Sequence, residues 1–199
     1  MAVIINASTS TGLVQSADTS GIIQFQSNGS TKATLNSSGF SYPGGVLQVV
    51  QTQKTNSFST SSSSFVDITG FSVSITPSSA SNKILVTVMI QASSNSAGWF
   101  GSRIRLVRNG TAIALGDADG SRVRATFDFS FNTSSASLIT PMPMVWLDSP
   151  SSTSAVTYKC DMQSLQGTTA FINKSSYDNG SDVYDTDVVS TITAMEIAA

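Results

Sequence analysis

Hydrophobic and polar residues alternate along most of this chain with a period of two, the spacing of a strand with one buried face. Short runs rich in Val, Ile, Thr and Phe are each bounded by Ser, Gly, Asn or Pro. No long segment has the 3.6-residue period of an amphipathic helix. The pattern predicts strands or strand pairs over residues 46–51, 65–74, 83–90, 101–115, 122–131, 139–147, 156–162 and 190–197.

Two Asn-Gly pairs indicate tight hairpins, because both residues accept the positive φ angles of a two-residue turn. Asn28-Gly29 follows a run in which Ile23 and Phe25 alternate with glutamines, and Asn109-Gly110 divides the segment 101–115. Strands at regular spacing with turn signals between them are typical of an all-β sandwich or barrel. The expected fold is therefore all-β, an antiparallel β-sandwich.

The sequence Tyr42-Pro43-Gly44-Gly45 predicts a boundary between two parts of the chain. Residues 1–45 form a polar arm of short hairpins, and residues 46–199 form the sandwich. Residues 83–90 have apolar side chains on both faces, which favours a central strand covered on both sides. The Ser- and Thr-rich segment 57–64 is expected to be an exposed loop.

Only 11% of the 199 residues are charged, against roughly 25% in a typical soluble domain. A lone sandwich normally protects its edge strands with charges, so an oligomer that covers edges and apolar faces is expected. Ten basic and twelve acidic residues give a net charge of −2. That balance predicts neither a nucleic-acid partner nor a membrane-surface partner. The N-terminus lacks the features of a secretory signal, which favours synthesis and assembly in a cytoplasm.

Catalytic chemistry has few candidate residues in this chain. Histidine is absent and Glu196 is the only glutamate, which removes histidine-based triads, histidine zinc sites and paired glutamates. The prediction is a protein that is not an enzyme and has no cofactor. Cys160 is the only cysteine, so no intrachain disulfide is possible, and its place in an alternating strand predicts a buried, inert thiol.

Arginine pairs and one aromatic pair are the candidate binding groups. Arg103 and Arg105 share one strand face and could bind an anion or a sugar, because guanidinium groups bind carboxylates through two hydrogen bonds. The simpler interpretation is cross-strand pairing with aspartates, for which the candidates are Asp117, Asp119 and Asp128. Trp99, next to Phe100, is either an exposed platform for a glycan or interface or a side chain buried under a loop.

Two acidic clusters resemble cation sites only in part. Residues 116–120, GDADG, are similar to part of a calcium loop, but Leu115 and Thr126 stand where that loop needs its first and last ligands. An Asp-stabilised turn is favoured there. The second cluster, in residues 176–187, is interpreted as a solvated loop with a structural cation as the alternative; its members are Asp178, Asp182, Asp185 and Asp187. No metal ligand is assigned.

The opening GLVQSADTSGIIQFQSNGSTKATLNSSG resembles the N-terminal segment of many virion proteins of tailed bacteriophages. The remainder resembles the jelly-roll domain of phage appendages, which is similar to the trimeric TNF/C1q-like sandwich. The stretches that carry this second resemblance are SSSSFVDITGFSVSITPSSASNKILV, RLVRNGTAIALGDADGSR, VWLDSP and STITAMEI. Together the two resemblances cover nearly the whole chain.

The resemblance implies a homotrimer on the virion surface, with residues 1–45 as the anchoring arm. The arm residues expected to bind the capsid or a partner chain are Ile4, Leu13, Val14, Ile22, Ile23, Phe25 and Leu35. The favoured role is a head decoration (cement) protein bound to the major capsid protein, similar to the cements of short-tailed cyanophages. About 45 residues before the sandwich leave little room for the shaft of a fibre.

Two alternatives remain: a tail-fibre or tailspike tip attached to tail proteins, and a carbohydrate-binding module carried on virions. In these the outward loops would contact a host surface glycan. The residues assigned to such an outward surface are Trp99, Arg103, Arg105 and Tyr177.

Overall fold

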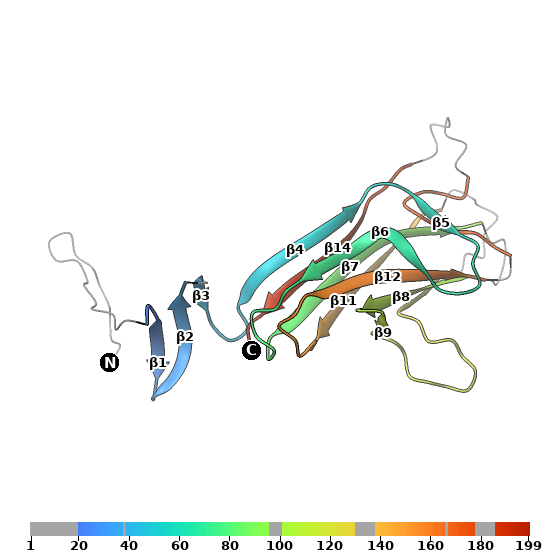
Figure 1. Cartoon of the computed structure of the whole chain (residues 1–199). Coiled ribbons are helices and arrows are strands. Elements are labelled where there is room, and N and C mark those ends of the chain that lie inside the picture. Colours follow the sequence, from blue (N-terminus) through green and yellow to red (C-terminus); the bar gives the residue numbers. More distant parts are fainter. Residues whose placement is uncertain (1–19, 38, 96–100, 130–137, 166, 178–185) are drawn as a thin grey trace. The chain divides into compact units, whose positions relative to one another are not determined.

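The computed structural model of the chain describes residues 20–37, 39–95, 101–129, 138–165, 167–177 and 186–199, and all regular elements in them are β-strands (Figure 1). Within these ranges, no helix is long and apolar enough to cross a membrane. The chain divides into two compact units, Met1–Gly45 and Val46–Ala199. The division falls at the same position as the boundary predicted from the sequence.

Fourteen strands occur in the described residues, three in the first unit and eleven in the second. They are β1 (Ile23–Ser27), β2 (Ser30–Asn36), β3 (Gly39–Ser41), β4 (Val46–Lys54), β5 (Phe58–Thr60), β6 (Val66–Ile75), β7 (Lys83–Ser94), β8 (Ser102–Arg108), β9 (Thr111–Ile113), β10 (Phe127–Phe129), β11 (Thr140–Asp148), β12 (Val156–Ser164), β13 (Ala170–Ile172) and β14 (Ser190–Ile197).

The first unit is a three-stranded antiparallel sheet in the order β1-β2-β3. The predicted hairpin between β1 and β2 is confirmed, and Asn28 and Gly29 both have positive φ angles, of 49° and 75°. These are the angles that a tight turn needs to match the twist of the flanking strands. The sheet is small, and nearly every side chain in it is exposed or only half-buried.

The larger sheet of the second unit is built around β7 and is called the β7 sheet here. Its order is β4-β14-β7-β13-β5, and β11 pairs with β7 as well. β14 pairs with residues 83–89 of β7 and β13 with residues 92–94, so these two strands follow one another along one side of β7. β11 pairs with residues 84–92 on the other side. The sheet is therefore four strands wide at its centre, and all pairings are antiparallel.

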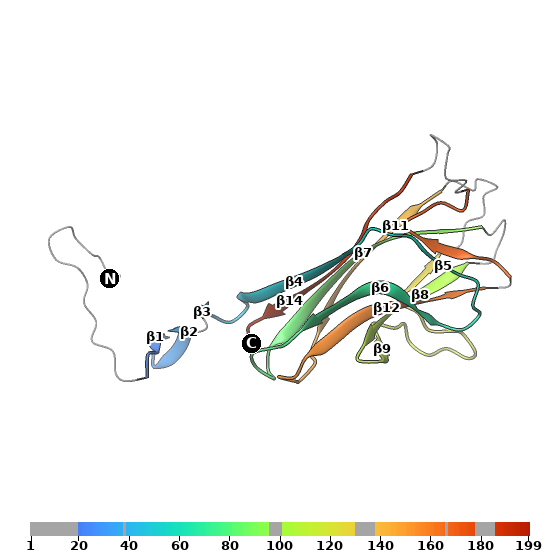
Figure 2. The same ribbon diagram turned by 45° about the horizontal axis from the view of Figure 1, so that its top comes forward.

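The second sheet of this unit is called the β12 sheet. Its order is β10-β8-β12-β6, with β9 also paired to β8. The two sheets lie face to face in a sandwich-like arrangement (Figure 2). The core between them takes alternate side chains from both sheets, for example Ile84 and Val86 from β7, and Leu106 and Cys160 from β8 and β12. The predicted buried position of Cys160 is confirmed.

Strand β6 contains an irregularity at Gly70 that changes the direction of the side chains on either side of it. Ile68 and Phe71 are both buried although they are three residues apart, which a regular strand does not allow. Gly70 lies between them with a φ of 75°, and the pairing with β12 shifts register between Lys159 and Asp161. This β-bulge turns both apolar side chains toward the core.

Two predictions about elements are corrected by the structure. The segment 57–64, expected to be an exposed loop, contains β5, which pairs with β13 at the end of the β7 sheet. Phe58 explains this, since it packs against the core and fixes the segment as a strand. Of the predicted strand 122–131, only Phe127–Phe129 is strand among the described residues. Thr126 ends it, because its hydroxyl accepts a hydrogen bond of 2.8 Å from the amide of Leu106.

Candidate functional site

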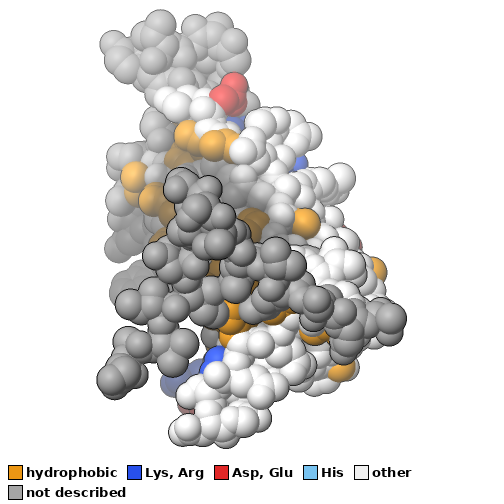
Figure 3. All heavy atoms as spheres, turned by 90° about the vertical axis from the view of Figure 1, so that its left-hand side faces the viewer, with side chains coloured by type: hydrophobic (Ala, Val, Ile, Leu, Met, Phe, Trp, Pro, Cys, Tyr) orange, Lys and Arg blue, Asp and Glu red, His pale blue; other side chains and the backbone are white. Residues whose placement is uncertain are grey.

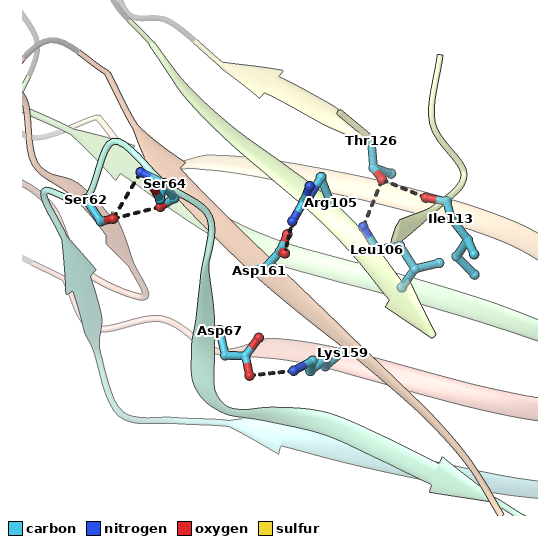
Figure 4. Close-up of polar contacts among 9 residues, drawn as sticks. All are labelled: Ser62, Ser64, Asp67, Arg105, Leu106, Ile113, Thr126, Lys159 and Asp161. Carbon is cyan, nitrogen blue, oxygen red and sulfur yellow. Dashed lines mark hydrogen bonds and ion pairs between the residues drawn. The ribbon is translucent and has the colours of Figure 1, made fainter. Parts of the chain in front are cut away.

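The outer face of the β12 sheet carries a group of paired charges, shown in Figure 4. Arg105 donates from Nε to Oδ1 of Asp161 at 3.0 Å and from a terminal nitrogen to Oδ2. The Phe65 ring lies against the same guanidinium, with its centroid 3.6 Å from Cζ. Arg105 is therefore held by a carboxylate in its plane and by an aromatic ring on its face.

Arg103 pairs with Asp128, its direct cross-strand neighbour on β10. The Nε atom of Arg103 lies 3.1 Å from Oδ2 of Asp128, which confirms one of the cross-strand pairings that the sequence offered. Lys159 and Asp67 form a further pair on the same face. Asp67 and Asp128 are more than half exposed, so such pairs contribute about 0–1 kcal/mol each.

A third arginine connects the two sheets. Arg108 on β8 donates to both carboxylate oxygens of Asp148, at 2.8 and 2.9 Å. Asp148 is the last residue of β11 in the β7 sheet, and Tyr158 of β12 donates its hydroxyl hydrogen to the same carboxylate at 2.6 Å. Burial and the negative Asp148 raise the pKa of Tyr158 well above its usual range, so this hydroxyl stays a donor.

A shallow hollow of about 340 Å³ lies beside the loop that contains the GDADG sequence. Arg122 and Asp119 form an exposed ion pair at its rim, at 3.0 Å, and Arg124 donates to the backbone oxygen of Gly116. The turn expected here is present, with the amide of Arg122 donating to the Asp119 oxygen and a positive φ at Gly120. The side chains of Asp119, Arg122 and Arg124 therefore stabilise the loop itself.

Two buried charged side chains lie at opposite ends of the paired strands β4 and β14. Glu196 accepts hydrogen bonds from Gln48, from the amide and hydroxyl of Ser78, and from Asn82. Burial alone raises the pKa of Glu196, but these hydrogen bonds outweigh it, and the pKa lies below its usual value. Lys54 donates to Asn56 and to the Thr69 backbone oxygen, and burial lowers its pKa.

The first unit places apolar side chains together on one exposed face. Ile23 pairs with Leu35 and Leu35 with Phe40 across the three strands. Phe25 contacts Phe40 edge-on, with ring centroids 5.8 Å apart, and Phe40 contacts Tyr42 at 5.9 Å. Lys32 is the only charged residue in the described part of this unit. The structure thus gathers an apolar sheet face that no described residue of this unit covers.

Phe40 and Tyr42 belong to this face but were not among the predicted arm residues. The sequence indicates them only through the alternation Phe40-Ser41-Tyr42. Three residues are too few to predict a strand, so their place on this face follows only from the structure. Of the predicted arm residues, Ile22, Ile23, Phe25 and Leu35 are exposed. The others, Ile4, Leu13 and Val14, lie outside the described residues.

The predicted outward residues do not form one group. Arg103 and Arg105 both pair with aspartates on the β12 sheet. Tyr177 is exposed after β13, and Trp99 lies outside the described residues. The second acidic cluster lies outside them too, apart from Asp187. Among the described residues, no three Asp, Glu or Cys side chains are placed to hold a metal ion.

Charged side chains are sparse on the face drawn in Figure 3, where hydrophobic side chains lie among uncharged polar ones. On the β12 sheet, Arg103, Arg105 and Lys159 are each paired with an aspartate. The described surface on the face drawn in Figure 3 is therefore largely uncharged, which suits protein contacts through apolar and amide groups.

No known family model matches this chain, and no curated protein matches it either. Among solved structures, it is similar to a chain in "Structure of infectious bursal disease virus Gt strain", with 15% sequence identity and a TM-score of 0.36. The match covers 88% of this chain and 42% of that one, so this chain spans less than half of the other's length.

Proposed function

We propose that this protein is a structural protein of a bacteriophage virion, a homotrimer that decorates the outside of the head and stabilises the shell. The observation that carries the proposal is the exposed apolar face of the first unit, formed by Ile23, Phe25, Leu35, Phe40 and Tyr42. A contiguous exposed apolar face of this kind marks an interaction site. In a decoration protein the major capsid protein covers it.

The strand order of the second unit supports a jelly roll of the TNF/C1q-like kind. The β7 sheet places β4, β14, β7 and β11 side by side, and the β12 sheet places β6, β12, β8 and β10 side by side. Successive strands of the chain thus alternate between the two sheets over much of the unit. Two such four-stranded sheets are the plan of an eight-stranded jelly roll.

A trimer with three arms binds the shell at three points. Once one arm is bound, the others meet the shell at the high effective concentration set by their tethers, so modest individual contacts add up to stable attachment. The sequence resemblance to virion proteins of tailed phages and the low charge of the chain both agree with this role.

The test is binding of purified protein to shells that lack it. Deletion of residues 2–40 is expected to leave a folded sandwich that no longer binds. A finer variant, Phe25→Ser with Phe40→Ser, removes the aromatic contact of the apolar face and is expected to reduce occupancy at least tenfold. Gln24→Ser with Gln26→Ser, on neighbouring exposed positions of β1, is the matched control. Full occupancy by the truncated protein would overturn the role of the arm.

A tail-fibre tip or a glycan-binding module is the second candidate, supported by the exposed ring of Tyr177 after β13. Immunogold labelling of virions with antibody against residues 46–199 separates the two placements. Gold over the head supports decoration, whereas gold at the tail end supports a tip. Binding of host polysaccharide that is lost in Tyr177→Ala would support the glycan-binding role.

A further inference from the structure

The outer face of the β7 sheet carries a continuous row of apolar side chains. Val49 of β4 pairs with Met195 of β14, Met195 pairs with Leu85 of β7, and Leu85 pairs with Leu147 of β11. Neighbouring residues on each strand, such as Val86 of β7 and Ala194 of β14, point into the core. Because side chains alternate along a strand, the four members of the row face away from the core.

This row is accessible over much of its length. Val49 is 55% exposed and Leu147 is 50% exposed, and Val145, the next outward residue of β11, is 67% exposed. Met89 of β7 is exposed on the same face. Single exposed apolar residues are ordinary on protein surfaces, but a row that crosses four paired strands is a patch, and patches of this kind mark interaction sites.

The two outer faces of the sandwich differ in charge. The β12 sheet presents arginine, lysine and aspartate pairs to its surroundings. Along β4, β7, β11 and β14, which lie entirely in the described residues, Lys83 at the start of β7 is the only charged side chain facing outward. The remaining outward positions are aliphatic, Met, Pro, Thr, Ser or Gln. Such a face packs against a neighbouring copy of the chain without charge repulsion, and it offers no complementary charge to a charged partner.

The size of this face also suits a partner of the same kind. Four strands spaced about 4.8 Å apart are roughly 19 Å wide, and the nine residues of β11 extend about 30 Å. The projected area is thus roughly 600 Å², somewhat below the ~800 Å² that each partner buries in a standard interface. The face supplies most of an interface, and flanking residues need to supply the rest.

We propose that the outer face of the β7 sheet, centred on the row from Val49 to Leu147, is the surface on which a second copy of this chain packs. This rests on the homo-oligomer that forms part of the proposed function and names the surface that holds it together. The contact buries the apolar row, and the Thr and Gln side chains beside it exchange hydrogen bonds with the neighbouring copy.

Sedimentation equilibrium of the purified protein tests this proposal without capsids. The wild-type chain is expected to be an oligomer, and Val145→Lys with Leu147→Lys is expected to weaken association at least tenfold. Both side chains are half or more exposed, so the fold is expected to persist, which circular dichroism checks. Thr69→Lys with Ser72→Lys, at exposed positions of β6 in the β12 sheet, adds the same charge elsewhere and is expected to leave the oligomer unchanged.

Two outcomes would overturn the proposal in different ways. A monomeric wild-type protein would remove the oligomer itself, while capsid binding through the arm could still be measured. An oligomer that tolerates both lysines would place the contact on another surface. If the lysine variant loses its fold, Val145→Thr with Leu147→Thr replaces it, because threonine is well accepted in strands, and weaker association is again the expected result.

Discussion

The hydroxyl of Tyr158 donates a 2.6 Å hydrogen bond to Oδ2 of Asp148, which joins the two sheets of the sandwich. Tyr158 belongs to β12 and Asp148 to β11, on opposite sides of the core. Arg108 contacts the same carboxylate from β8. A buried carboxylate is costly unless it is paired and hydrogen-bonded, and here both partners come from the opposite sheet. The contacts of Tyr158 and Arg108 with Asp148 therefore fix how one sheet is aligned on the other.

Replacing Tyr158 with Phe is expected to lower the free energy of unfolding by about 1.5–3 kcal/mol, the usual contribution of a hydrogen bond to a charged group. The ring keeps its place in the core, so the change removes the hydroxyl alone. Urea unfolding followed by circular dichroism measures the effect. Tyr177→Phe, at an exposed position, is the control and is expected to change the stability by less than about 0.5 kcal/mol. Equal stability of the two variants would contradict a stabilising role for the hydrogen bond between Tyr158 and Asp148.

Acid is expected to weaken the fold through Glu196. Its pKa is lower in the folded chain than in the unfolded one, because hydrogen bonds from Asn82, Gln48 and Ser78 outweigh the effect of burial. The resulting stabilisation is fully present above the unfolded pKa of about 4.3 and is lost as the pH falls through the folded value. Urea unfolding at a series of pH values between neutrality and strong acid measures this dependence.

Glu196→Gln is the comparison for the acid series. The amide does not titrate, so the stability of this variant is expected to fall less steeply with acid than that of the wild-type protein. It is also expected to be less stable at neutral pH, because Gln48 and Asn82 then donate to a neutral oxygen. Parallel curves for the two proteins would mean that other carboxylates cause the acid dependence.

The thiol of Cys160 is expected not to react with a disulfide reagent such as DTNB in the folded protein. It is fully buried, and burial together with the neighbouring Asp161 raises its pKa far above the usual range. The thiolate, which is the reactive form, is therefore nearly absent. In concentrated guanidinium the single thiol is expected to react at once. Rapid reaction of the native protein would contradict the described core.

The hairpin at Asn109-Gly110 is expected to be sensitive to the residue at its first position. Asn109 has a φ of 48°, and its side-chain oxygen accepts a 2.8 Å hydrogen bond from the amide of Thr157. Asn109→Ala loses this bond and strains the backbone, with an expected cost of about 1–2 kcal/mol. Asn109→Gly keeps the backbone freedom and loses only the side-chain bond, so it is expected to cost less. Thermal unfolding of both variants measures the difference.

The sequence predicts the strands that are long enough to show alternation. The final strand, 190–197, is placed correctly at both ends, and the two predicted Asn-Gly turns, at Asn28 and Asn109, are present. The strands β5 and β13 are missing from the prediction because three residues do not define a period. They exist because β13 pairs with the end of β7 and β5 pairs with β13, and these pairings are a property of the tertiary fold.

The candidate site is harder to predict because it depends on how distant strands pair. The sequence offers Asp117, Asp119 and Asp128 as partners for the arginines of this strand. Arg105 instead binds Asp161, which is 56 residues away in the chain and lies on a neighbouring strand. The row from Val49 to Leu147 likewise joins four strands from both ends of the second unit. The alternation of apolar and polar residues predicts which face of the strand each side chain is on. Only the register between strands decides which side chains become neighbours.

The central place of β14 sets an order of events during synthesis. This strand lies between β4 and β7, yet the ribosome makes it after every other described strand of the β7 sheet. At about 5 to 20 residues per second, β4 emerges on the order of 10 s before its partner exists. The apolar row includes Met195 and is incomplete until then. On the proposal above, copies pack through this face only after residue 197 has been translated.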